Sequence, residues 1–142
     1  MAALSGPRNT TTRGAFIYRL NVPVAASTTI WKGSIVMLNS SGYAIPAATA
    51  ATTPCMGIAD QTVVNSGSAG SVSVDCLVGL AGLFDVTGSF TQADNGKLAY
   101  FSDDHTITRT ATSNSAAGTI VEFVSTTACW VYFDLSSPVG IA

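Results

Sequence analysis

Residues 95–133 constrain the fold more strongly than any other part of the chain. They read NGKLAYFSDDHTITRTATSNSAAGTIVEFVSTTACWVYF. Short runs of alternating apolar and polar residues are separated here by turns rich in Asp, Ser and Asn, which is typical of a β-meander. The pattern predicts strands near 97–101, 106–110, 119–125 and 128–135. No segment of the chain has a convincing helical period, so the sequence predicts an all-β fold.

An earlier stretch, residues 33–59, follows the same plan. Each copy has a glycine-led strand, a polar turn, a short apolar return, an Ala/Thr/Ser loop and a second strand that starts at glycine. The first strands match through Gly33, Ile35 and Leu38 in one copy and Gly96, Leu98 and Phe101 in the other. Two such units could pack as a small sandwich or barrel. Similar turn chemistry alone could also produce the match, so duplication and coincidence both stay open.

The chain has 142 residues, enough for one domain with a substantial core. Residues 1–14, MAALSGPRNTTTRG, carry almost no bulky apolar side chain and cannot bury themselves. They predict an extended N-terminal arm that becomes ordered only against another surface. Residues 15–142 predict a single β domain, a compact small β-sandwich or barrel of hairpins with little or no helix.

Charge is scarce and unevenly distributed. Charged residues make up 10% of the chain, against about 25% in ordinary soluble domains, so much of the surface is expected to be covered by a partner. The basic residues Arg8, Arg13, Arg19 and Lys32 all precede the first acid, Asp60. This basic front end indicates contact with a negative surface, and a solubilising tail is the alternative. Four scattered charges are too few to predict nucleic-acid binding.

The three cysteines, Cys55, Cys76 and Cys129, are odd in number and widely spaced. Such spacing argues against a disulfide framework or a zinc site and favours buried thiols in a reducing compartment. No apolar run approaches the roughly 18 residues of a membrane helix, so we expect no membrane partner.

Asp103, Asp104 and His105 form the densest polar cluster. Carboxylates and imidazole can bind a metal or transfer protons. The same residues can equally form a β-turn whose Asp side chains bond their own backbone. The single histidine favours the turn, and no nucleophile elbow or phosphate-binding glycine loop occurs. We therefore expect neither an enzyme nor a bound metal or cofactor.

Aromatic residues give one further alternative. Trp31, Tyr43, Tyr100 and Trp130 could stack against a sugar or a nucleotide. Their neighbours are apolar and strand-like, which favours packing in the core or in a subunit interface, above all for Trp31 and Trp130.

The chain resembles the capsid decoration, or cement, proteins of tailed bacteriophages. The segments that carry the resemblance are KGSIVMLNSSGYAIPA at 32–47, GIADQTV at 57–63, AGSVSVDCLVG at 69–79, NGKLAYFSDDHTIT at 95–108 and WVYFD at 130–134. The resemblance implies an all-β protein, often a homotrimer, that is made in the host cytoplasm and binds the exterior of the expanded head. There it would staple neighbouring major capsid protein subunits.

Within that resemblance, Arg8, Arg13 and Arg19 would dock on acidic patches of the major capsid protein. The arm could also add a strand to an exposed capsid edge. A surface-adhesion or carbohydrate-binding module that uses Trp31 or Trp130 is the alternative function.

Overall fold

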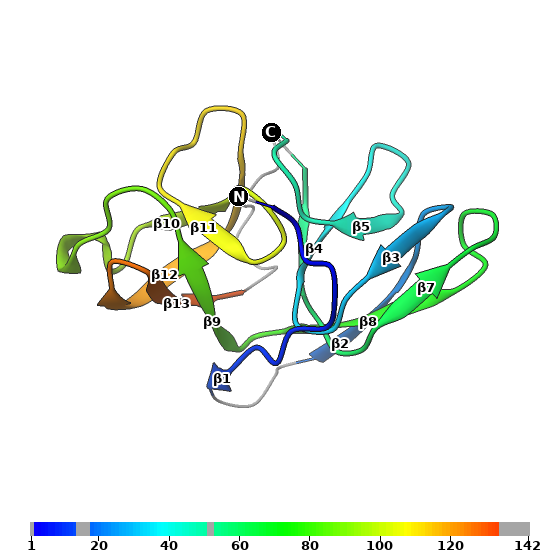
Figure 1. Ribbon diagram of the computed structural model, residues 1–142, viewed down its shortest axis with the longest axis horizontal. Coiled ribbons are helices and arrows are strands. Elements are labelled where there is room, and N and C mark those ends of the chain that lie inside the picture. Colours follow the sequence, from blue (N-terminus) through cyan, green and yellow to red (C-terminus); the bar gives the residue numbers. More distant parts are fainter. Residues whose placement is uncertain (1, 14–17, 51–52, 134–142) are drawn as a thin grey trace.

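The structure is a computed structural model that describes residues 2–13, 18–50 and 53–133, and its described residues form two strand-rich units side by side (Figure 1). The fold is all-β, as predicted, and within the described part of the chain the one helical turn is the short 3₁₀ segment η1 (Gln92–Asp94). The strands of the first half are β1 (Thr12–Arg13), β2 (Tyr18–Pro23), β3 (Thr28–Ile30), β4 (Ile35–Leu38), β5 (Ala44–Pro46), β6 (Cys55–Ala59), β7 (Val63–Asn65) and β8 (Ser73–Val78). Those of the second half are β9 (Ala81–Val86), β10 (Leu98–Phe101), β11 (Thr106–Thr108), β12 (Ser115–Ser125) and β13 (Ala128–Tyr132).

The second half, here called the C-terminal unit, is a closed barrel of five strands. The strands follow the order β9-β11-β10-β12-β13, and β13 pairs again with β9. All these pairings are antiparallel except β9 with β11. Closure gives every strand of the barrel a partner on both sides, although β11 pairs only with Asp85 and Val86 at the end of β9.

The first half, here called the N-terminal unit, has the sheet order β2-β8-β6-β4-β5, and β3 pairs with β7 in a small second sheet. A parallel bridge between Val24 and Ala44 brings the end of β2 next to β5, at the opposite edge of the sheet. The N-terminal unit is therefore curved almost to closure.

The two units share one strand plan. In each, a central strand (β4 or β10) pairs antiparallel with the strand after it and with the strand after that. Each central strand follows a glycine with positive φ, Gly33 at +86° and Gly96 at +87°. A register shift occurs at the same distance from that glycine, between Val36 and Met37 in β4 and between Ala99 and Tyr100 in β10. The two units therefore share their pairing order, the leading glycine and the place of the register shift, as the sequence match between them indicated.

Apolar side chains form two clusters. One fills the N-terminal unit, and the other fills the C-terminal barrel and extends into the space between the units. Neighbouring residues of β4 belong to different clusters. Ile35 packs in the cluster that extends between the units, and Val36 packs in the cluster of the N-terminal unit. Strand β4 is therefore buried on both faces, which explains its uninterrupted apolar sequence.

The three cysteines are buried free thiols, as predicted. Burial raises the pKa of Cys55, Cys76 and Cys129 to about 12, so they pack as small hydrophobic side chains.

Candidate functional site

Residues 2–13 form an extended strap that lies on the body of their own chain. The Arg8 N–H donates to the Lys32 carbonyl at 2.7 Å, and the Leu83 N–H donates to the Thr11 carbonyl at 2.8 Å. Strand β1 then pairs with the start of β9, so the strap adds a strand to the C-terminal unit (Figure 1). The arm is extended, as expected, but the surface against which it is ordered belongs to the same molecule.

Arg8 lies partly buried beneath the strap. Its Nη1 donates to the Leu83 carbonyl at 3.1 Å and to Thr10 Oγ1 at 2.9 Å. The guanidinium carbon is 5.2 Å from the centre of the Phe84 ring, and Nη2 is 3.7 Å from an Asp85 carboxylate oxygen. The hydrogen-bond donors of the Arg8 guanidinium and its contact with the Phe84 ring thus hold the strap against β9.

Arg13 covers Trp130 at the end of the strap. Its guanidinium carbon is 4.0 Å from the centre of the Trp130 ring, and its two terminal nitrogens donate to the two Glu122 carboxylate oxygens at 3.0 and 3.1 Å. The hydrogen bonds from Arg13 lower the pKa of Glu122. Trp130 is 6% exposed, so it packs within its own chain.

This contact gives a first prediction. In a Trp31→Phe background, where Trp130 is the only tryptophan, Arg13→Gln is expected to shift the emission maximum to longer wavelength. The reason is that water replaces the guanidinium over the indole. Fluorescence spectra with acrylamide quenching measure the change, and Arg19→Gln in the same background is the matched control. An unchanged spectrum in the Arg13 variant would show that Arg13 does not shield Trp130 in solution.

The three candidate capsid-contact arginines do not gather at one place. Arg19, on β2, is paired with Asp60 and lies 3.9 Å from Asp75, so it belongs to the N-terminal unit. Arg8 and Arg13 are instead fastened to strands of the C-terminal unit. Each of the three has an acidic partner within the chain. Trp31, between β3 and β4, is half-buried.

Asp103, Asp104 and His105 form a turn between β10 and β11, and the His105 N–H donates to Asp103 Oδ1 at 3.0 Å. The turn itself was predicted, but its burial was not. Asp103 is 5% and Asp104 1% exposed. The strap closes over the turn, because the Leu4 N–H donates to Asp104 Oδ1 at 3.0 Å.

The His105 ring is held from both sides by oxygen atoms. Nδ1 lies 2.9 Å from Asp85 Oδ2, and Nε2 lies 2.9 Å from the Ala2 carbonyl oxygen. Burial lowers the pKa of His105, but the bonds to Ala2 and Asp85 and the nearby charges of Asp103 and Asp104 outweigh it, so the pKa is raised. Burial raises the pKa of Asp104 against the lowering effect of the Leu4 N–H.

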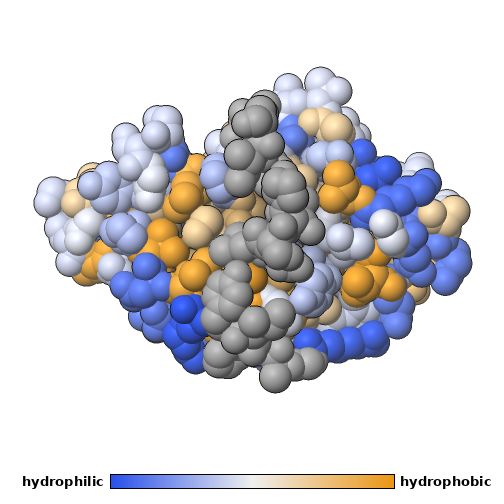
Figure 2. Space-filling view, turned by 180° about the vertical axis from the view of Figure 1, so that it is seen from behind, coloured by the Kyte–Doolittle hydropathy of each residue, from blue (hydrophilic) through white to orange (hydrophobic). Residues whose placement is uncertain are grey.

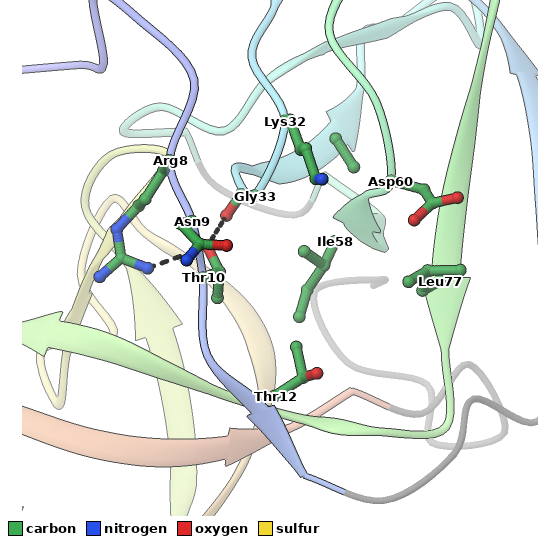
Figure 3. Close-up of a pocket in the computed structure, with 10 residues that line it drawn as sticks. Arg8, Asn9, Thr10, Thr12, Lys32, Gly33, Ile58, Asp60 and Leu77 are labelled. Carbon is green, nitrogen blue, oxygen red and sulfur yellow. Dashed lines mark hydrogen bonds between the residues drawn. The ribbon is translucent and has the colours of Figure 1, made fainter.

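A cavity of about 220 Å³ lies between the strap and the N-terminal unit (Figure 3). Thr10 and Thr12 of the strap line it on one side, and Ile58 and Leu77 of β6 and β8 on the other. Pockets that bind drug-sized ligands hold about 300–1,000 Å³, so this cavity is smaller than a typical ligand site.

The outer surface of the C-terminal unit carries three exposed apolar side chains, Leu98, Val121 and Val124, which are here together called the apolar patch. These side chains are 42%, 46% and 49% exposed. Leu98 on β10 pairs with Thr119 of β12, and Val121 and Val124 lie at register shifts of β12 against β13. Figure 2 shows hydrophobic residues reaching the surface in both halves of that view, next to strongly hydrophilic and weakly polar areas. In the N-terminal unit Val64 is 60% exposed.

No protein-family model, no curated protein and no solved structure matches the chain. Within the described residues, no helix has both the length and the apolar character needed to cross a membrane.

Proposed function

We propose that the chain is a structural capsid decoration protein that binds the exterior of a phage head and stabilises contacts between major capsid protein subunits. The observation that carries the proposal is the exposed apolar patch of Leu98, Val121 and Val124 on a chain with only 10% charged residues. Exposed apolar patches mark protein contact sites, and a surface of few charges suits broad neutral contacts. The sequence resemblance to capsid decoration proteins supplies the identity of the partner.

The proposed assembly is a homotrimer on the outside of the virion. Three copies attach together, so each contact can be weak while the assembly stays bound. Arg8, Arg13 and Arg19 remain predicted capsid contacts. Each already forms an ion pair within the chain, with Asp85, Glu122 and Asp60 respectively. To dock on the capsid, each arginine must give up that partner and pair with an acidic residue of the capsid instead.

Sedimentation tests the proposal directly. The purified protein is expected to sediment as a trimer and to saturate expanded, emptied heads at a fixed ratio of copies to capsid subunits. Unexpanded proheads are the comparison. The proposed function would be contradicted if the protein sedimented as a monomer and did not bind expanded heads.

A variant with Val121→Ser and Val124→Ser tests the patch. Both side chains are about half exposed and lie outside the core clusters, so the fold is expected to persist. Occupancy on expanded heads is expected to fall at least about tenfold, since apolar side chains buried in an interface contribute about 1.5–3 kcal/mol each. Val64→Ser, in the N-terminal unit, is the matched control. If Val64→Ser lowered the occupancy on expanded heads as much as the double variant does, the apolar patch would not be the specific capsid contact.

The carbohydrate-binding alternative is less well supported by the geometry. A sugar would have to displace the Arg13 guanidinium from Trp130 before it could stack there. Trp31 is only half-buried and stays a candidate for packing in a subunit interface.

A further inference from the structure

Two carboxylate oxygens under the strap have no hydrogen-bond partner. Asp103 Oδ2 and Asp104 Oδ2 are both buried and unpaired, although the other oxygen of each group accepts a backbone N–H. A buried anionic oxygen without a donor is costly, and such groups are normally paired or bound to a cation. Adjacent carboxylates also repel each other, so this pair calls for positive charge at that point.

His105 is oriented as a metal ligand would be. Its Nδ1 contacts the Asp85 carboxylate at 2.9 Å, which fixes the ring. Nε2 bonds the Ala2 carbonyl oxygen at 2.9 Å and lies 3.6 Å from Asp103 Oδ1. Metal-binding histidines commonly donate their second ring nitrogen to a carboxylate in this way. Asp85 itself comes from β9 and not from the turn, so the arrangement is built from two separate parts of the chain.

The spacing suits a single ion. One ligand atom each from Asp103, Asp104 and His105 can be chosen so that all lie within 4.8 Å of one another. Ligands of Zn²⁺ lie about 2.0–2.2 Å from the ion, so two of them are separated by at most about 4.4 Å, and by about 3.4 Å in a tetrahedral site. The three ligand atoms therefore have to close in around the ion when it binds.

We propose that Asp103, Asp104 and His105 bind one divalent transition-metal cation, Zn²⁺ or Mn²⁺, beneath the strap. Two carboxylates and one imidazole suit these ions better than Ca²⁺ or Mg²⁺, which prefer oxygen ligands alone. The Ala2 carbonyl oxygen, 2.9 Å from His105 Nε2, is the fourth ligand. The ion replaces the proton on Nε2, which passes to solvent.

Such a site would fasten the strap to the body. Ala2 belongs to the strap, and Leu4 already bonds Asp104 beside the ion. The ion binds the folded chain and not the unfolded one, so it raises the stability of the fold. The proposal does not depend on the capsid function.

Calorimetry and thermal unfolding test the site in the full-length protein after treatment with EDTA. Titration with ZnCl₂ and with MnCl₂ is expected to show one ion per chain. At a concentration about a hundredfold above Kd, the melting temperature is expected to rise by about 5 °C or more. No heat of binding with either ion up to 1 mM would overturn the proposal, as would binding of CaCl₂ alone.

Asp104→Asn and His105→Gln are the decisive variants, and Asp60→Asn is the matched control. Asparagine keeps the oxygen that accepts the Leu4 N–H, so Asp104→Asn preserves the turn while it removes the charge and replaces the unpaired Oδ2 by an amide nitrogen, a poor metal ligand. Its metal-free melting temperature is expected to equal or exceed that of the parent, while the metal-induced rise disappears. The Asp60→Asn control is expected to show the same metal-induced rise in melting temperature as the parent. If that rise persisted in both Asp104→Asn and His105→Gln, the assignment of these residues as metal ligands would be wrong.

Discussion

Phe84→Ala is expected to lower the free energy of unfolding by about 3–5 kcal/mol, because it leaves a large cavity in the larger core cluster. Phe84 is fully buried in the larger core cluster. Its ring meets the Phe133 ring edge-on with centroids 5.6 Å apart, and the Arg8 guanidinium lies 5.2 Å from its centre. The substitution therefore removes both a core side chain and an anchor of the strap.

Urea unfolding followed by circular dichroism measures this effect. Strand β9, which carries Phe84, pairs with β1, β11 and β13, so a local collapse of the cavity is difficult. Val64→Ala is the control, since Val64 is 60% exposed and its truncation is expected to change stability by no more than about 0.5 kcal/mol. A loss below about 1 kcal/mol in Phe84→Ala would mean that the barrel core repacks freely.

The sequence predicted the fold class, and indicated the strand plan that the two units share, because both depend on local signals. Period-two alternation and turn residues identify strands and corners within a few positions of each other. The start of β12 was missed for the same reason. Ser115–Gly118 looked like a small polar loop, yet Ala116 and Ala117 are buried strand residues. These alanines are small because the interior of a narrow barrel leaves little room for side chains. That restriction comes from the closed barrel, so the local sequence pattern does not indicate it.

The turn at 103–105 shows where local reasoning ends. The bond from the His105 N–H to Asp103 joins residues two apart and was predictable. The bond from Leu4 to Asp104 joins residues 100 apart, and that from His105 to Asp85 joins residues 20 apart. Burial of the two carboxylates comes from these distant contacts, so the sequence could name the cluster but not its surroundings.

The basic front end shows a related difficulty. Its charge indicated a negative partner, and Arg13 does meet a carboxylate, that of Glu122, 109 residues away. Charge distribution gives the sign of a partner but not whether it lies in the same chain. The predicted capsid contact of these arginines therefore depends on the binding experiments and not on their charge.

Two glycines at matching places in the repeat define the last prediction. Gly57 in β6 and Gly118 in β12 each lie against a backbone carbonyl of the neighbouring strand, Leu77 for Gly57 and Tyr132 for Gly118. A Cβ atom at either position would overlap that carbonyl oxygen, and a backbone atom in a paired strand cannot move aside at low cost. The close approach belongs to the shared strand plan, so both units depend on glycine for the same reason.

Gly118→Ala is expected to lower the free energy of unfolding by about 2–3 kcal/mol through overpacking. Gly57→Ala should cost about 1–2 kcal/mol more, since Gly57 also has a φ of +105°, which alanine adopts poorly. Gly6→Ala is the matched control, because a Cβ there meets nothing within 4 Å. Urea unfolding of the three variants measures the order of their free energies of unfolding. If Gly118→Ala proved as stable as the control, β12 and β13 would not approach each other this closely, and the equivalence of the two units at this position would fail.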